Sequence, residues 1–291
     1  MMPCAPLTRH TGTPQPRRRP GCGDAPVYNE PTLSVGNDHA LRRRGGDVRL
    51  TRLYVPDPLA PASEAELPGS AAAHVARVLR LRPGDPLVLF DGSGADFRAE
   101  VASVGGGRVR VCILERVPGL AESPLRVTLV QAVSRGERMD WTLQKATELG
   151  VRRIRPVFSA RSVVRLDGDQ AERRLRHWEA VVASACEQCG RSVLPVVEPP
   201  VELARHLAGP PGAAVRLLLG PRSSGTLASR AAGLEEVELL IGPEGGLDDA
   251  ETETALAAGY VAVRLGPRVL RTETAGIAAL AVLQALAGDL R

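Results

Sequence analysis

The sequence has no apolar run that approaches the ~20 residues a membrane-spanning helix requires, so no membrane association is expected. Its first residues are rich in Pro and Arg and contain no apolar core, unlike a secretory signal. Hydrophobic residues make up 44% and charged residues 24% of the 291, as in ordinary soluble globular proteins. We therefore expect a cytoplasmic protein with one large or two modest domains.

Cysteine is scarce as well, and its five residues form an odd set without the spacing of a disulfide framework. Cys186 and Cys189 make a C-x-x-C pair, but no second pair or suitably spaced histidine accompanies them. Two reduced thiols on one helix face are therefore favoured over a metal or redox site. No metal is expected.

Lysine is almost absent, because 36 of the 37 basic residues are Arg and the remaining one is Lys145. Heavy use of Ala, Arg, Gly and Pro indicates a coding bias, so this lysine either fills a role that Arg cannot or survives by chance on a solvated helix. The formal net charge of +4 is weak evidence for a nucleic-acid partner. Seven Arg and four acidic residues within 1–47 account for +3 of it.

Residues 1–47 contain Pro and Gly clusters, two Arg triplets and no apolar periodicity. Such a segment cannot bury enough surface to offset its ordering entropy, so we expect it to be disordered. Two interpretations are open. The segment is an arm that touches RNA, or translation begins near Val48.

Residues 48–118 are predicted to form a compact, mostly β domain with one helix, and residues 119–124 a linker. Ser70 is the expected N-cap of the helix, which runs to Arg80. Glycine-rich turns separate the strands. The expected strands lie within residues 53–55, 87–90, 97–104 and 109–117. Small β-barrels of this kind commonly bind RNA, but fold alone does not establish that.

Residues 125–291 alternate between apolar strands and helical patterns, which predicts an α/β domain with a parallel sheet covered by helices. Gly150 is expected to end the first helix as a C′ residue. The predicted strands are 127–133, 154–158, 215–219, 237–241 and 261–265, and the predicted helices are 140–149, 169–189, 247–258 and 272–287.

Three of these strands end in loops that contain glycine, after Leu219, Ile241 and Leu265. In open α/β sheets ligands bind beyond the carboxyl ends of the strands, and glycine lets main-chain groups approach a flat ligand closely. Such a pocket suits an adenine ring. The alternative is that each Gly-Pro simply turns the chain. Neither a P-loop nor a dinucleotide fingerprint is present, which disfavours an enzyme of nucleotide phosphates.

The glycine loops also carry a specific resemblance. Residues 241–246 (IGPEGG) and 265–275 (LGPRVLRTETA) resemble the signature of the RsmE family, which are ribosomal small-subunit RNA uridine N3-methyltransferases of the SPOUT class. Upstream, residues 144–150 (QKATELG), 187–191 (EQCGR) and 74–80 (HVARVLR) match it too. The resemblance covers roughly residues 48–291.

This resemblance implies features that no periodicity could predict. The second domain would have a trefoil-knotted SPOUT fold, although knots are rare. The first would be a PUA-like barrel that docks RNA. Family members are homodimers that use S-adenosylmethionine, and their substrate is ribosomal RNA or the small subunit.

The expected site follows from the loops and the resemblance together. Arg271 is the first choice to stabilise negative charge on the uracil oxygens, and Glu273 is a candidate base whose alternative role is helix capping. Lys145 and Glu148 could simply pair. The residues expected to bind the methyl donor are Leu219, Gly220, Ile241, Gly242, Pro243, Glu244, Gly246, Leu265, Gly266, Leu270, Arg271 and Thr272. Those expected to contact RNA are His74, Arg77, Arg80, Lys145, Arg161 and Arg191. The alternative for the first three is an ordinary solvated face, and for Arg161 and Arg191 a structural role such as fixing the catalytic loop.

Two rival functions remain open at this stage. A SPOUT enzyme that methylates another position, such as a ribose 2′-hydroxyl, would share every motif named above. A non-catalytic RNA-binding assembly factor would share the fold, although intact glycine loops and Arg271 argue against it.

Overall fold

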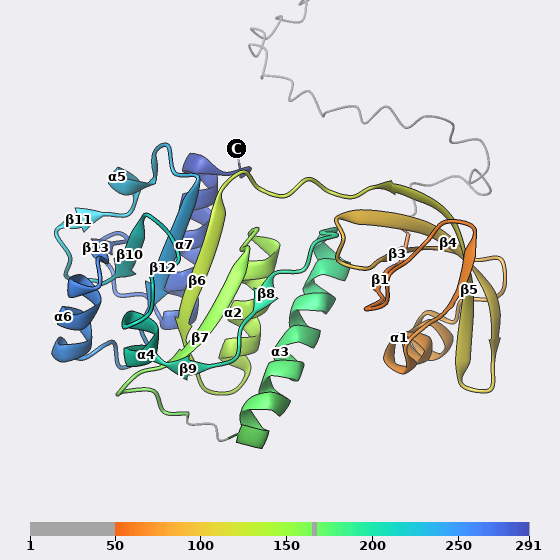
Figure 1. Ribbon diagram of the computed structural model, residues 1–291, viewed down its shortest axis with the longest axis horizontal. Coiled ribbons are helices and arrows are strands. Elements are labelled where there is room, and N and C mark those ends of the chain that lie inside the picture. The colour runs from red at the N-terminus through yellow and green to blue at the C-terminus, as the bar shows by residue number, and fades with distance from the viewer. Residues whose placement is uncertain (1–49, 165–167, 291) are drawn as a thin grey trace, which may run out of the picture. The chain divides into compact units, whose positions relative to one another are not determined.

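The computed structural model of the protein describes residues 50–164 and 168–290. The predicted disordered extension, residues 1–47, lies outside them. The described residues belong to one compact unit, Arg49–Arg291, and contain a five-stranded and an eight-stranded sheet (Figure 1).

The five-stranded sheet has the order β1-β3-β4-β5-β2, and β1 pairs with β3 in parallel while the other neighbours are antiparallel. Side chains along β4 alternate between buried and half-buried, which places one face of the sheet on a core. The expected turn between the two long strands is present, with Gly106 and Gly107 at positive φ. The strands are β1 (Arg52–Tyr54), β2 (Ser63–Glu66), β3 (Pro86–Phe90), β4 (Ala95–Gly105) and β5 (Arg108–Pro118).

The predicted helix of this part is irregular. It consists of α1 (Gly69–Ala73) and a π-helical turn, η1 (His74–Leu79), and Val75 from this turn is fully buried in the core. The prediction of Ser70 as N-cap is wrong, because Pro68 takes that position and Ser70 already lies inside the first turn. No side-chain oxygen caps this end of the helix. Arg80 ends the turn in the left-handed region, at φ 54°.

The second sheet is parallel throughout, with the order β11-β13-β10-β12-β6-β7-β8 and β9 on β7. The five predicted strands are confirmed as β6 (Arg126–Ala132), β7 (Arg153–Phe158), β10 (Arg216–Leu219), β12 (Glu236–Ile241) and β13 (Val261–Arg264). Sequence reasoning missed β8 (Val196–Val197), β9 (Val201–Glu202) and β11 (Gly225–Thr226). Two residues are too few to show a strand period.

Helices cover both faces of this sheet (Figure 1). On one face α2 (Glu137–Glu148), α3 (Gly168–Cys189) and α7 (Thr272–Ala287) contribute Leu143, Trp178 and Leu280 to the larger core. On the other, α4 (Leu203–Leu207) and α6 (Asp249–Ala257) enclose a smaller core. A short helix, α5 (Ala228–Ala231), packs against α7. The strands serve both faces because alternate residues point to opposite sides.

The end of α2 is the predicted one, and the start of α6 carries a well-defined cap. Gly150 follows α2 with φ 75°, a conformation that glycine adopts without strain. Asp248 caps α6, because its carboxylate accepts a hydrogen bond from the Glu251 amide at 2.7 Å. The Glu251 carboxylate in turn accepts one from the Asp248 amide, which completes a capping box.

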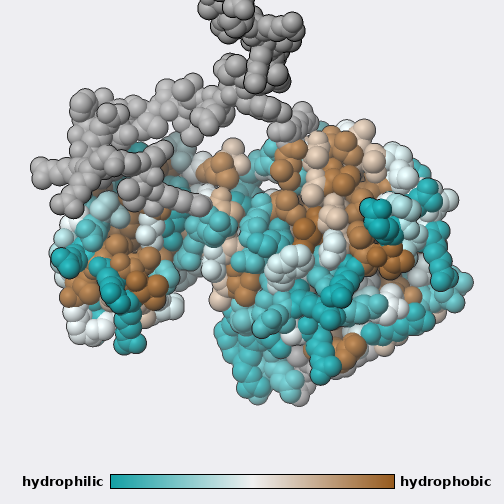
Figure 2. Space-filling model, turned by 180° about the vertical axis from the view of Figure 1, so that it is seen from behind, coloured by the Kyte–Doolittle hydropathy of each residue, from teal (hydrophilic) through white to brown (hydrophobic). Residues whose placement is uncertain are grey.

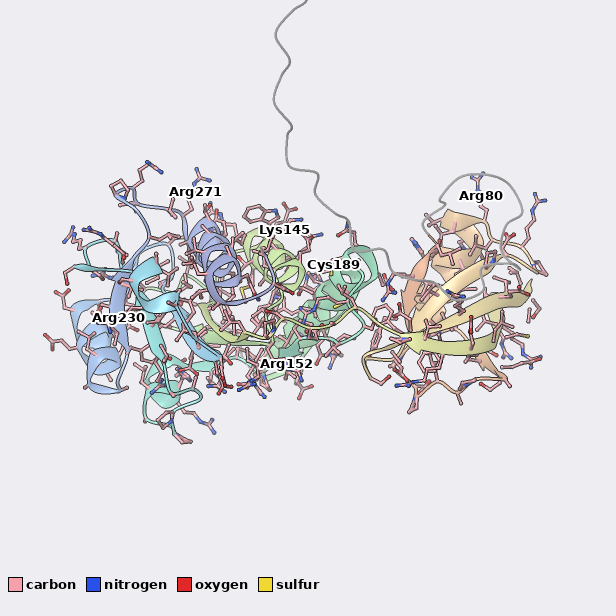
Figure 3. The ribbon with its side chains drawn as sticks, turned by 90° about the horizontal axis from the view of Figure 1, so that it is seen from above. Arg80, Lys145, Arg152, Cys189, Arg230 and Arg271 are labelled. Carbon is pink, nitrogen blue, oxygen red and sulfur yellow. The ribbon has the colours of Figure 1, made fainter. Side chains whose placement is uncertain are left out.

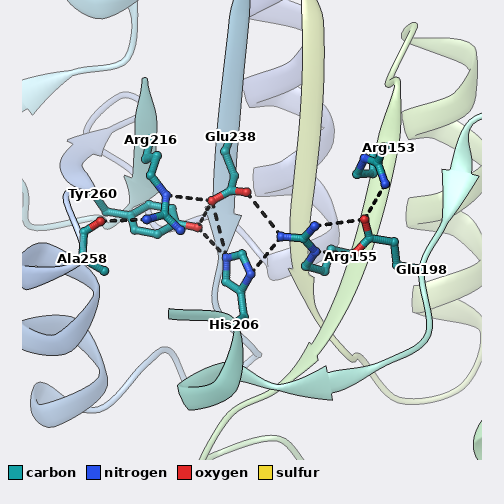
Figure 4. A network of polar contacts seen from close by, with 8 residues as sticks. All are labelled: Arg153, Arg155, Glu198, His206, Arg216, Glu238, Ala258 and Tyr260. Carbon is teal, nitrogen blue, oxygen red and sulfur yellow. Dashed lines mark hydrogen bonds and ion pairs between the residues drawn. The ribbon is translucent and has the colours of Figure 1, made fainter. Parts of the chain in front are cut away.

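A buried polar network crosses the sheet beneath α4 (Figure 4). Glu238 on β12 is fully buried and accepts hydrogen bonds from Arg216 Nε at 2.9 Å and from the Tyr260 hydroxyl. His206 Nε2 lies 2.8 Å from that hydroxyl, and Arg155 lies 3.0 Å from His206 Nδ1. Burial alone raises the pKa of Glu238, but the hydrogen bonds from His206, Tyr260 and Arg216 outweigh it and bring the pKa to about 2. The carboxylate is therefore charged at neutral pH.

Candidate active site

The three predicted glycine loops leave the same edge of the second sheet. Leu219 is paired in register with Ile241 on one side and with Val263 on the other. Ile241 is paired in turn with Gln131 of β6. Because all these strands are parallel, their carboxyl ends and the loops that follow them meet at one edge.

Backbone geometry explains why glycine stands in these loops. Gly246 and Gly266 both have φ 70°, in the left-handed region. A Cβ on either would meet no atom within 4 Å, so space lies open in front of both. A Cβ on Gly242 would instead come within 3.2 Å of the backbone nitrogen of Leu247. A larger residue at position 242 would therefore displace the backbone. The loops thus combine close packing behind with open space in front.

Thr272, the first residue of α7, attaches that helix to the middle loop. Its hydroxyl donates to the Gly242 carbonyl oxygen at 2.6 Å and accepts from Gln131 Nε2 at 3.1 Å. Gln131 is fully buried on β6, so the anchor is rigid. Both the position and the rotation of the first turn of α7 are therefore fixed relative to the loop.

Charged side chains secure the same loop from outside. Arg138 of α2 pairs with Glu244 at 3.2 Å. Arg161, an expected RNA contact, donates from its guanidinium to the Gly245 carbonyl oxygen at 3.0 Å. Both pairs are partly exposed, so each holds the loop without closing it.

A cavity of about 620 Å³ lies where the first turn of α7 faces α2 and α3. Arg271 reaches it from an exposed position, whereas Glu273 is only 8% exposed, and its Oε2 atom has no hydrogen-bond partner among the described residues. Figure 3 shows Arg271 and Lys145 on one side of the sheet and Arg152 on the other. The cavity is lined by Glu137, Arg138, Asp140, Trp141, Gln144, Val181, Ser184, Arg271, Glu273 and Thr274.

The expected RNA-contacting residues fall into different settings. His74, Arg77 and Arg80 are all exposed along η1 and its end, as a phosphate-contacting face requires. Lys145 forms the anticipated pair with Glu148, at 2.8 Å, and remains partly exposed.

Arg191 lies in a setting that favours the structural alternative. This side chain is 4% exposed and donates to the Glu122 carboxylate and to the carbonyl oxygens of Thr147 and Val151. These internal hydrogen bonds favour a structural role for the guanidinium over an RNA contact. Arg191 instead fastens the segment before β6 to the end of α2.

The C-x-x-C pair shows no sign of metal or redox chemistry. Cys186 is buried, and burial raises the pKa of its thiol to about 12, so it stays protonated at neutral pH. Within residues 50–164 and 168–290, no group of three or more His, Cys, Asp or Glu side chains is arranged to hold a metal ion. In the same ranges no helix is long and apolar enough to span a bilayer.

Sequence reasoning missed several residues of this site. Gln131, Arg138 and Trp141 carry no loop motif, and their positions near the glycine loops depend on strand pairing and on how α2 packs. Gln144 stands in a matched motif, but nothing in the sequence indicated that it lines a cavity with Glu273. A polar residue in an apolar strand, as at Gln131, was the one available signal.

Comparison with known proteins identifies the family. Residues 121–284 match the model of an RNA methyltransferase domain, and residues 67–114 match that of an RNA methyltransferase PUA domain. The ribosomal RNA small subunit methyltransferase E of Mycobacterium tuberculosis is 38% identical over 233 residues, which are 76% of this chain and 86% of the relative. The chain belongs to this methyltransferase family. The resemblance stated from the sequence is thereby confirmed.

Solved structures agree in fold. The ribosomal RNA small subunit methyltransferase E of Neisseria gonorrhoeae, bound to S-adenosyl methionine, is similar with a TM-score of 0.77 and 38% identity, over 84% of this chain and all of that one. A putative methyltransferase from Legionella pneumophila, in complex with the same cofactor, gives 0.81 and 40%, with the same coverage. The fold is therefore the expected SPOUT class with a PUA-like domain before it. The exact domain boundaries stay predictions.

Proposed function

We propose that the protein transfers a methyl group from S-adenosylmethionine to N3 of a uridine in small-subunit ribosomal RNA. One observation carries this proposal: the glycine loops adjoin a cavity that holds both a cation, Arg271, and the buried carboxylate of Glu273, whose Oε2 has no hydrogen-bond partner in the part of the chain that the structure describes. The names of the relatives and the cofactor in the similar structures support the substrate and the donor.

The three loops fit the methyl donor by their shape. Open space in front of Gly246 and Gly266 leaves room for a flat ring against the main chain, and Leu219, Ile241 and Leu265 supply apolar walls. Thr272 holds the Gly242 loop in place from behind. S-adenosylmethionine bound there would supply an electrophilic methyl group. The other residues we assign to the donor are Gly220, Gly242, Pro243, Glu244, Leu270 and Arg271.

The acceptor nitrogen has to lose its proton before it can react. The pKa of uridine N3 is roughly 9, so its ionisation at pH 7 costs about 3 kcal/mol at 1.36 kcal/mol per unit. Glu273 takes this proton, and Arg271 stabilises the negative charge that spreads to O2 and O4. The freed electron pair of N3 forms the bond to the methyl carbon as the carbon–sulfur bond breaks. The sulfonium thereby becomes a neutral thioether.

In this proposal the helix of the first domain, formed by α1 and η1, contacts the RNA. His74, Arg77 and Arg80 lie exposed along one turn, where they can meet phosphates without reading sequence. Lys145 and Arg161 stand nearer the cavity, on α2 and beside the glycine loop. Both groups of residues suit a contact with free ribosomal RNA or with the assembled subunit.

A homodimer is also part of the proposal. The far end of α7 exposes the apolar side chain of Leu286 (47%), and Leu290, beyond the helix, is 48% exposed. Figure 2 shows apolar residues gathered over the face that α2 and α7 cover. A second copy would bury the end of this face that carries Leu286 and Leu290, away from the first turn of α7, since contiguous exposed apolar patches commonly mark interaction sites.

The proposal is tested by calorimetric titration with S-adenosylmethionine, followed by nucleoside analysis of small subunits incubated with enzyme and donor. We expect saturable donor binding and N3-methyluridine as product. Gly242→Trp should abolish binding, and Gly105→Ala, in the distant hairpin, should leave it unchanged. A ribose-methylated product would support the rival SPOUT activity. Absence of donor binding by folded protein would support the assembly-factor reading.

A further inference from the structure

The cavity beside the glycine loops contains more polar groups than proton removal requires. Gln144 lines it from α2 and is half-buried. Trp141, one turn earlier on the same helix, is 44% exposed and lines the same space. A helix places residues three apart on one face, so both side chains face the cavity together.

The volume and lining suit a single flat base. About 620 Å³ lies within the ~300–1,000 Å³ typical of small-molecule sites. Trp141 offers an aromatic face, and stacking on such a face is the usual way in which proteins hold an unstacked base. The apolar Val181 of α3 lines the same cavity.

The polar groups match one base edge. The pairing edge of uracil presents an acceptor at O4, a donor at N3–H and an acceptor at O2. Glu273 supplies an acceptor, and the Gln144 amide and the Arg271 guanidinium supply donors. Cytosine presents a donor, an acceptor and an acceptor, so its N3 lone pair would oppose the Glu273 carboxylate. The cavity therefore favours uracil.

We propose, on the basis of the function proposed above, that this cavity receives the target uracil. Trp141 stacks on the ring, Gln144 and Arg271 donate to its two oxygens, and Glu273 accepts the N3 proton. Gln144 is thus a specificity-determining residue and not merely a surface residue of α2. Bound uracil would give a donor to Glu273 Oε2, which is buried and has no hydrogen-bond partner among the described residues, and a buried acceptor without a donor is costly.

The test measures methyl transfer to small subunits that carry unmodified RNA, with donor affinity measured in parallel. Gln144→Ala should lower kcat/KM on the order of tenfold, and Trp141→Ala by a similar factor, because each removes one contact to the base. S-adenosylmethionine affinity should not change in either variant. Glu253→Ala, at an exposed position of α6 on the other face of the sheet, is the control and should behave as wild type.

A change of specificity gives the sharper test. Gln144→Glu with Glu273→Gln converts the edge to acceptor, donor, donor, which complements cytosine. The affinity of this double variant for a subunit carrying cytidine at the target position should exceed its affinity for the uridine form, in reverse of wild type. Binding to the two subunits is compared directly, so the result does not depend on catalysis.

Three outcomes would overturn the proposal. They are unchanged kcat/KM in both alanine variants, an unchanged base preference in the double variant, and dissociation of the dimer by Trp141→Ala as the sole cause of lost activity. Light scattering of each variant detects the last. If wild type makes no N3-methyluridine, the function itself is refuted, which the wild-type arm shows independently of the variants.

Discussion

The decrease in the free energy of unfolding at acidic pH should depend on Glu238. This carboxylate is fully buried, and its pKa falls from an ordinary 4.5 to about 2 in the fold. A group whose pKa is depressed by folding contributes stability above its unfolded pKa. That contribution is lost as the pH falls through the folded pKa. The relevant window therefore runs from about pH 5 down to about pH 2.

The size of the effect follows from the shift. A difference of about 2.5 units corresponds to about 3 kcal/mol at 1.36 kcal/mol per unit. About 2 kcal/mol of this should be lost by pH 3. In Glu238→Gln the side chain no longer titrates, and Arg216 keeps a buried charge without a carboxylate. We therefore expect the variant to be about 3 kcal/mol less stable than wild type at pH 7 and about 1 kcal/mol less stable at pH 3.

Urea unfolding followed by circular dichroism at pH 7, 5, 4 and 3 measures this narrowing gap. Glu115→Gln is the matched control, because Glu115 pairs with Arg98 at 2.9 Å on the surface and should contribute less than about 1 kcal/mol. If the single variant does not fold, Glu238→Leu with Arg216→Met removes both charges and should recover much of the stability. A gap between wild type and Glu238→Gln that stays constant from pH 7 to pH 3 would refute the reasoning.

Three further predictions concern single contacts. Thr272→Val removes the hydroxyl that anchors α7 to the glycine loop, so it should lower the free energy of unfolding by about 1–2 kcal/mol and weaken donor binding. Thr272→Ser should bind the donor normally in calorimetry. Equal donor affinities of the two variants would contradict this. Asp248→Ala should lower the free energy of unfolding by about 1 kcal/mol because it removes the capping box, and a larger loss in Asp249→Ala would be inconsistent with that. Arg191→Ala should lower the free energy of unfolding by about 3 kcal/mol, since it leaves buried acceptors unpaired. The folded variant should retain wild-type RNA affinity in filter binding. A clear drop in this affinity would support Arg191 as an RNA contact.

Local patterns predicted much of the fold because their causes are local. Apolar runs of strand length and a helical period mark β6, β7, β10, β12 and β13 and the helices between them. Strand order is different, since it depends on pairings between residues far apart in the sequence. Nothing in the sequence alone indicated that β12 would lie between β10 and β6.

The buried network illustrates a second limit. Glu238 stands in a strand whose other residues are mostly apolar, and a sequence pattern gives no reason to place its partners on β10, α4 and the loop before β13. Each partner is needed because an isolated buried carboxylate would be severely destabilising. The pairing is therefore a property of the assembled sheet.

The candidate site likewise has one part that the sequence predicts and one part that it does not. The glycine loops were predictable because a conformation with positive φ restricts the residue type at that position. The cavity was not, because it forms where three helices from separate parts of the chain meet. Arg191 shows another limit: two roles were open for an Arg inside a matched motif, and only the fold shows that it joins two segments.

In the proposed function, the first turn of α7 connects the donor loop with the acceptor cavity, and this constrains the reaction. Thr272 and Glu273 are consecutive, so the helix directs their side chains about 100° apart, one to the glycine loop and one to the cavity. Because Thr272 is held by two hydrogen bonds, the direction of Glu273 is set by the same anchor. A direct displacement requires the nucleophile to align with the methyl group and the leaving sulfur, and small misplacements are costly. A single rigid turn that positions both substrates meets this requirement without a moving part.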